Sequence, residues 1–138
     1  MSIRLYSNFH RVMIIDNDQI DRFILKHLIS KNKFSDIILE YDDANKALDY
    51  LIENQNHLFL LPQIIFIDIR MPGMYCFEFM KEYDKLSSIL KSTSKVFITS
   101  SIGISSIDRS KLDGKNIGSF IDKPVTQDYL EVIKSLFC

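Results

Sequence analysis

Short apolar runs alternate with segments of helical period along the chain. Five runs that are rich in β-branched and aromatic residues predict strands, at 11–15, 37–41, 64–67, 96–98 and 119–121. Runs that are apolar at nearly every position suit strands covered on both faces, which is typical of a parallel sheet. Because these strands alternate with helical segments, the pattern indicates repeated βαβ units and predicts an α/β fold.

Four segments carry apolar residues at the spacing of a helix face. The first two begin behind Asp18 and Asp43, which are good N-caps, and the last begins behind Thr126. The polar segment 105–112 precedes a turn signal and predicts at most two turns of helix. The residues expected to face the sheet are Ile20, Phe23, Ile24 and Leu28; Ala44, Ala47, Leu48, Leu51 and Ile52; Cys76, Phe77, Phe79, Met80 and Tyr83; and Tyr129, Leu130, Ile133, Leu136 and Phe137.

The composition fits one globular domain, with 46% hydrophobic and 25% charged residues in 138. We therefore expect a single domain over 1–138, with a core at about 10–137 and no output domain behind it. A net charge of -1 without a dense basic run does not favour nucleic acid or a membrane surface as a partner. The N-terminus lacks the apolar core of a signal peptide, and no apolar stretch is long enough to span a bilayer, so a cytoplasmic protein is expected.

Polar residues follow two strands that should be neighbours in the sheet. Asp68 comes directly after the apolar run 64–67, and the first strand ends in Asp16, Asn17 and Asp18. Right-handed crossovers place these strands side by side, and ligand sites of open α/β sheets form at the carboxyl ends of the strands. Converging carboxylates repel one another, and hard oxygen ligands with room for water suit magnesium. Taken alone, Asp18 is more simply a helix cap and Asp68 a turn residue.

Two more strand ends contribute donors to the same edge. The fourth strand ends in Thr99 and Ser100, and the fifth is followed by Lys123 and Pro124. A hydroxyl and an ammonium both donate hydrogen bonds to phosphoryl oxygens. The combination of donors and carboxylates therefore favours phosphoryl chemistry at this edge.

These motifs, in this order and at this spacing, resemble the response-regulator receiver family of two-component signalling. The resemblance runs from Arg11 to Phe137 and is carried by the acidic cluster after the first strand, Asp68 with MPGM, the Thr99-Ser100 pair and Lys123-Pro124. It implies a flavodoxin-like (βα)5 doubly wound sandwich with a parallel sheet of order 2-1-3-4-5. It also implies a cis peptide bond between Lys123 and Pro124.

The same resemblance implies a role for each site residue. Asp68 would be the phosphoacceptor of a phosphorelay, with Thr99 and Lys123 holding the phosphoryl group. Asp16, Asn17, Asp68 and the backbone carbonyl of Arg70 would bind Mg²⁺. Thr99 and Phe120 would form a switch that reshapes the face made by 105–112, the fifth strand and the last helix. The donor would be a sensor histidine kinase or histidine phosphotransfer protein and the target another protein, which makes the chain a phosphoprotein switch and not an enzyme.

Two departures from the family pattern keep other interpretations open. Asn17 stands where the family usually has a second acid, and Tyr75-Cys76 replaces the usual Asp-Gly. One alternative is thus a receiver-like interaction module that takes no phosphate. The other is a phosphohydrolase of the haloacid dehalogenase type, since its DxD motif resembles Asp16-Asn17-Asp18. Against it, only Asp128 and Glu131 follow Lys123, within an expected helix, where that family needs an acidic pair.

Overall fold

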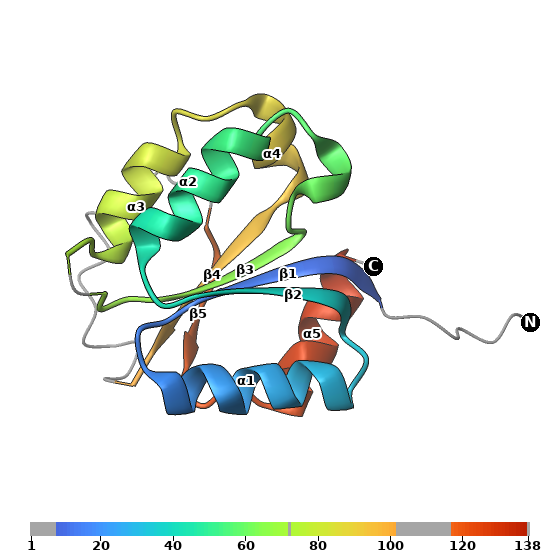
Figure 1. Cartoon of the computed structure of the whole chain (residues 1–138). Coiled ribbons are helices and arrows are strands. Elements are labelled where there is room, and N and C mark those ends of the chain that lie inside the picture. The colour runs from blue at the N-terminus through green and yellow to red at the C-terminus, as the bar shows by residue number, and fades with distance from the viewer. Residues whose placement is uncertain (1–7, 72, 102–116, 138) are drawn as a thin grey trace, which may run out of the picture.

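The computed structural model describes residues 8–71, 73–101 and 117–137, and these contain five strands and five α-helices (Figure 1). The strands are β1 (Phe9–Ile15), β2 (Ser35–Tyr41), β3 (Ile64–Asp68), β4 (Lys95–Ser100) and β5 (Ile117–Asp122). The helices are α1 (Gln19–Lys31), α2 (Ala44–Asn54), α3 (Cys76–Tyr83), α4 (Ser88–Thr93) and α5 (Gln127–Phe137), and a 3-10 turn, η1 (Leu58–Leu60), precedes β3. All five predicted strands are confirmed, each with slightly wider bounds.

The strands form one parallel sheet in the order β2-β1-β3-β4-β5, which confirms the predicted topology. Ile15 pairs with Ile67 across β1 and β3, and Asp68 pairs with Thr99 across β3 and β4. The carboxyl ends of the three central strands therefore lie level with one another. This register brings the polar residues at those ends to one edge of the sheet.

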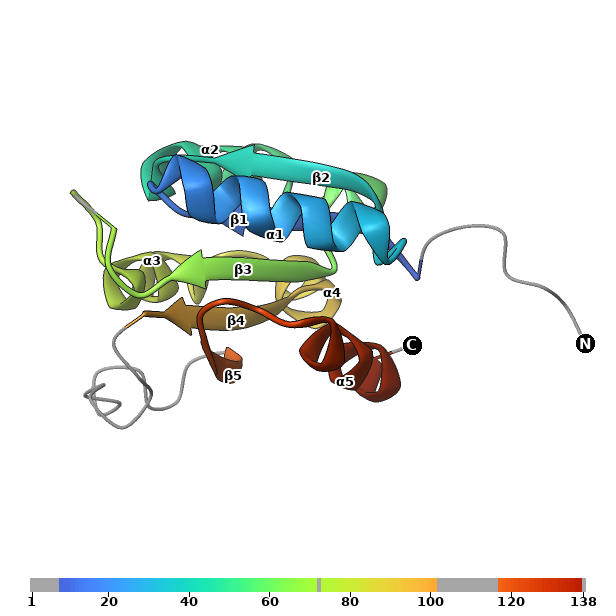
Figure 2. The ribbon, with the colours of Figure 1, turned by 90° about the horizontal axis from the view of Figure 1, so that it is seen from below.

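Helices cover both faces of the sheet, as Figures 1 and 2 show: α2, α3 and α4 on one face, α1 and α5 on the other. Met13 and Ile15 of β1 belong to the core under α2 and α3, while Val12 and Ile14 belong to the core under α1 and α5. Each fully buried aliphatic or aromatic side chain contributes about 1.5–3 kcal/mol. The helices add Ala44, Ala47, Leu48, Leu51, Phe79, Met80, Tyr83 and Leu90 to the first core, and Ile29, Leu130 and Ile133 to the second.

The predicted buried face of α1 is wrong at Ile20, Phe23 and Ile24 and right at Leu28. Ile20, Phe23 and Ile24 are 69%, 67% and 46% exposed, whereas Ile29 is fully buried and Leu25 and Leu28 pack against the core. The helix carries two overlapping apolar stripes, and the one at Leu25, Leu28 and Ile29 faces the sheet. The other helices follow the prediction more closely, although Ile52, Leu136 and Phe137 are also exposed.

The connection between α3 and β4 contains a helix that the pattern did not predict. In α4, the hydroxyl of Ser87 accepts a hydrogen bond from the amide of Leu90, and the Leu90 side chain is buried. The helix expected at 105–112 lies outside the described residues. Within the described part of the chain, no helix has the length and apolar character needed to cross a membrane.

Candidate functional site

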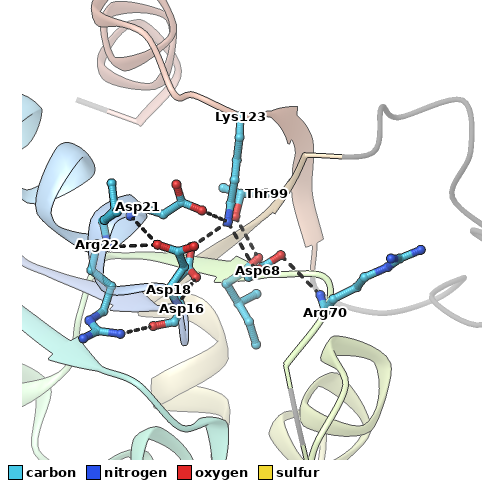
Figure 3. A network of polar contacts seen from close by, with 10 residues as sticks. Asp16, Asp18, Asp21, Arg22, Asp68, Arg70, Thr99 and Lys123 are labelled. Atoms are coloured by element: carbon cyan, nitrogen blue, oxygen red, sulfur yellow. Dashed lines mark hydrogen bonds and ion pairs between the residues drawn. The ribbon is translucent and has the colours of Figure 1, made fainter.

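The ammonium of Lys123 lies among three carboxylates at the carboxyl edge of the sheet (Figure 3). Its Nζ is 2.7 Å from Asp16 Oδ2, 2.9 Å from Asp21 Oδ2 and 3.2 Å from Asp68 Oδ2. The sequence predicted that Asp16, Asp68 and Lys123 would meet here. Asp21, in the first turn of α1, was not predicted, although it shares a helical stripe with Leu25 and Leu28 and that spacing could have pointed to it.

Strand ends fix the three predicted residues. Asp16 directly follows β1, and its amide donates a hydrogen bond to the carbonyl of Tyr41. Asp68 is the last residue of β3. The amide of Lys123 donates to the Ser100 carbonyl, which continues the β4–β5 pairing beyond the end of β5. The Lys123-Pro124 peptide bond is cis, as the family resemblance implied.

The start of α1 is tied to the same edge. The Asp18 carboxylate accepts hydrogen bonds from the amides of Ile20 and Asp21, which confirms its prediction as an N-cap. The amide of Asp18 in turn donates to Asp16 Oδ1 at 2.9 Å. Arg22 donates from Nη1 to the Asp16 carbonyl at 2.7 Å and from Nε to a carboxylate of β2 at 3.0 Å. These bonds hold the first turn of α1 against the end of β1.

Negative charge exceeds positive charge in this cluster. Burial raises the pKa of Asp16, against the lowering effect of Lys123 and the Asp18 amide, and the nearby charge of Asp68 raises it further. For Lys123, burial alone lowers the pKa, but the hydrogen bonds to Asp16 and Asp21 and the charge of Asp68 outweigh it, so the pKa lies above its ordinary value. The ammonium is therefore firmly charged and leaves the carboxylates partly uncompensated.

The remaining predicted residues lie around this centre. Thr99 is buried in register with Asp68, and its hydroxyl is 3.4 Å from the Ile67 carbonyl oxygen. The amide of Arg70 donates to Asp68 Oδ1 at 3.3 Å. Asn17 is exposed in the loop before α1, and Phe120 is half-buried against the core under α2 and α3. Of this group, the structure thus joins Arg70 directly to Asp68 and sets Thr99 beside it on the next strand.

A cavity of about 290 Å³ opens beside the ammonium, between α1 and the segment that follows β5. Its lining includes the polar residues Asp21, Thr99 and Lys123 and the apolar residues Ile24 and Val125. A group that enters this cavity therefore meets ammonium and hydroxyl donors together with apolar surface.

The donor set suits a hard cation with few protein ligands. Among the described residues, no three Asp, Glu, His or Cys side chains are placed to hold a metal ion together. Magnesium, however, is commonly bound by one or two carboxylates with water completing its shell. Asp16 and Asp68, with their excess negative charge, match that smaller requirement.

Comparison with known proteins gives the same class as the fold and the site. The sequence matches the response regulator receiver domain over residues 12–133, so the chain belongs to that family. Receiver domains are signalling switches, not enzymes.

Solved structures agree over almost the whole chain. A two-component response regulator from Cytophaga hutchinsonii is 26% identical with a TM-score of 0.81, over 93% of this chain and 96% of that one. A response regulator receiver protein from Dyadobacter fermentans is 23% identical with a TM-score of 0.78, over 93% and 98% of the two chains, and supports the fold.

A curated relative is much longer than this chain. It is the protein-glutamate methylesterase/protein-glutamine glutaminase of Sulfurimonas denitrificans, 32% identical over 75 residues, which are 54% of this chain and 20% of that protein. The match thus spans about a fifth of the relative's length, and the activities in its name are those of that protein.

Proposed function

We propose that this chain is a phosphoacceptor switch of a two-component phosphorelay and that Asp68 accepts the phosphoryl group. The observation that carries the proposal is the placement of the Asp68 carboxylate at the end of β3, 3.2 Å from the Lys123 ammonium. Membership in the receiver family supports the same role. We also propose that residues 1–138 hold one receiver domain that works in the cytoplasm.

In the proposed reaction, a carboxylate oxygen of Asp68 attacks the phosphorus of a phosphohistidine on a donor protein. The new P–O bond forms as the P–N bond breaks, and the donor imidazole leaves with the electron pair of that bond. Lys123 neutralises charge on the transferring group, and the Thr99 hydroxyl donates a hydrogen bond to a phosphoryl oxygen. The product is an acyl phosphate on Asp68.

Magnesium fits the oxygen ligands of this edge and, when bound, supplies positive charge next to the phosphoryl oxygens. Asp16, Asn17, Asp68 and the carbonyl of Arg70 would hold it. The two carboxylates would attract the cation, because Asp16 is buried close to Asp68 and Lys123 balances their negative charge only in part.

The donor is a sensor histidine kinase or a histidine phosphotransfer protein. The cavity beside Lys123 supports this, because it opens to the surface next to exposed apolar residues of α1, where a protein partner can pack. The signal passes from Asp68 to the two predicted switch residues, Thr99 on β4 and Phe120 on β5. A downstream protein then binds a face to which β5 and α5 contribute.

The test is uptake of a phosphoryl group from acetyl phosphate with Mg²⁺, followed by the intact mass of the protein. The wild-type chain should gain one phosphoryl group, and Asp68→Asn should gain none while remaining folded by circular dichroism. Asp49→Asn, an equivalent change on the exposed side of α2, is the matched control and should be labelled like the wild type.

Two outcomes would contradict the proposal. Binding of partners without any phosphoryl uptake by the wild type would favour the non-phosphorylated module. Continuous release of inorganic phosphate from small phosphomonoesters, without a retained label, would favour the phosphohydrolase.

A further inference from the structure

Asp21 is the unexpected member of the carboxylate cluster. It lies in the first turn of α1, where its backbone amide is capped by Asp18, and its own carboxylate points to the Lys123 ammonium (Figure 3). An acid at this position would be explained by the helix dipole alone if it faced solvent. However, its carboxylate lies 2.9 Å from the largely buried Lys123 ammonium, which indicates a role beyond the helix dipole.

An ammonium group has three N–H donors and accepts no hydrogen bonds. In this structure Asp16, Asp21 and Asp68 take one contact each, so the three donors of Lys123 are matched by three carboxylates. A phosphoryl group on Asp68 brings new anionic oxygens that need the same donors. Phosphorylation ends the contact of Lys123 with the free Asp68 carboxylate, and the several phosphoryl oxygens then compete with Asp16 and Asp21 for the Lys123 donors.

We infer that Asp21 is a positioning residue that holds the Lys123 ammonium toward α1 in the unphosphorylated chain and competes with the phosphoryl group for it. This inference rests on the proposed function, since it describes how the same site is restrained before phosphorylation. Asp21 itself touches neither the phosphoryl group nor the acceptor oxygen in this scheme.

The burial of the carboxylates decides which of them is released. The Asp21 side chain is 38% exposed, whereas that of Asp16 is 7% exposed, and Asp16 also accepts a hydrogen bond from the Asp18 amide. A carboxylate that can reach water loses little when it leaves an ion pair, while a buried one keeps an unpaired charge. Asp21 is thus the partner that Lys123 gives up at least cost.

Beryllofluoride, an analogue of the phosphoryl group that binds aspartate carboxylates, tests the competition without any transfer step. Its affinity is measured by calorimetry at saturating Mg²⁺, so that changes in metal affinity do not enter. Asp21→Asn should bind it about three- to fivefold more tightly, the size expected for loss of a half-exposed ion pair. Asp21→Ser, which also lacks the carboxylate, should show the same gain, and Asp21→Glu should stay closer to the wild type.

Asp18→Asn is the matched control. It removes a neighbouring charge from the same loop, and asparagine remains a good N-cap. The Asp18 carboxylate accepts hydrogen bonds from the amides of α1, so the substitution removes no contact with Lys123. Its beryllofluoride affinity should stay near that of the wild type. An equal gain in Asp18→Asn would overturn the inference, because the effect would then come from net charge and not from the contact with Lys123.

The two proposals fail in different ways. A wild-type chain that binds beryllofluoride, together with unchanged or weaker binding in both Asp21→Asn and Asp21→Ser, would overturn the inference alone. A wild-type chain that binds no beryllofluoride at saturating Mg²⁺ would overturn the proposed function, and the competition with it.

Discussion

Helices α1 and α2 look alike in the sequence and behave differently in the structure. Each follows a strand that ends beside acidic residues, each is capped by an aspartate, and each carries apolar residues at helical spacing. In α2 the expected stripe is buried except at Ile52, with Ala47 and Leu51 fully inaccessible. In α1 three of the four residues of the expected stripe are in solvent, and Phe23 is 67% exposed.

The difference follows from where each helix begins. β2 is the edge strand, so the loop before α2 lies away from the site, and α2 is free to bury its most apolar stripe. The loop before α1 follows β1, next to β3 and Asp68. There Asp21 pairs with Lys123 and Arg22 binds the Asp16 carbonyl, and both contacts accompany the rotation that turns Leu25, Leu28 and Ile29 to the sheet. Polar contacts at a functional edge thus help to choose between the two apolar stripes of α1.

The largest expected contrast is in stability. Leu51→Ala should lower the free energy of unfolding by about 2–5 kcal/mol, because it leaves a cavity in the core under α2 and α3. Phe23→Ala, the matched truncation on α1, should change it by no more than about 0.5 kcal/mol. Urea unfolding followed by circular dichroism measures both. A loss above about 2 kcal/mol in Phe23→Ala would mean that α1 packs through the stripe described here as exposed.

A second contrast concerns magnesium. Adjacent acids, Asp42 and Asp43, precede α2, and Asn17→Asp places adjacent acids before α1 as well. The added negative charge should tighten Mg²⁺ binding about tenfold, or about 1.4 kcal/mol. The added repulsion should lower the thermal stability of the metal-free protein. Asp42→Asn, in the loop away from the site, should leave the affinity unchanged. Calorimetric titration that shows equal or weaker binding in Asn17→Asp would place the side chain of residue 17 away from the metal.

The smallest contrast is between the two caps. The Asp18 carboxylate accepts two amide hydrogen bonds and that of Asp43 accepts one. Asp18→Ala should therefore cost about 1–2 kcal/mol of unfolding free energy, and Asp43→Ala about 0.5–1 kcal/mol. Thermal and urea unfolding of the two variants measure the difference. A larger loss of unfolding free energy in Asp43→Ala than in Asp18→Ala would contradict the expectation.

The sheet could be predicted from the sequence because its signals are local. Each strand is a short apolar run, and the order of the strands follows from right-handed crossovers between them. The carboxyl-edge site then follows, since Asp16, Asp68 and Lys123 each stand just at or beyond a strand end. The α4 helix could not be predicted this way, because Ser88–Thr93 holds only two apolar residues, Ile89 and Leu90, next to each other and shows no periodic stripe.

The arrangement of side chains within the site was harder to predict from the sequence. Asp21 reads in sequence as an ordinary acid near a helix N-terminus, and only the rotation of α1 turns it to Lys123. That rotation brings Asp21 to Lys123, which lies 102 positions further along the chain, so the two residues meet only in the fold. The sequence therefore predicted which strands form the site but not which turn of helix completes it.

The most direct test of the account locates the phosphoryl group. After reaction with acetyl phosphate and Mg²⁺, borohydride reduces an acyl phosphate to an alcohol, which converts the labelled aspartate into homoserine. Tandem mass spectrometry of the digested protein then identifies the position. Homoserine is expected at position 68 of the wild-type chain, and none is expected in Asp68→Asn. Homoserine at Asp16, Asp18 or Asp21 in place of Asp68 would contradict the account.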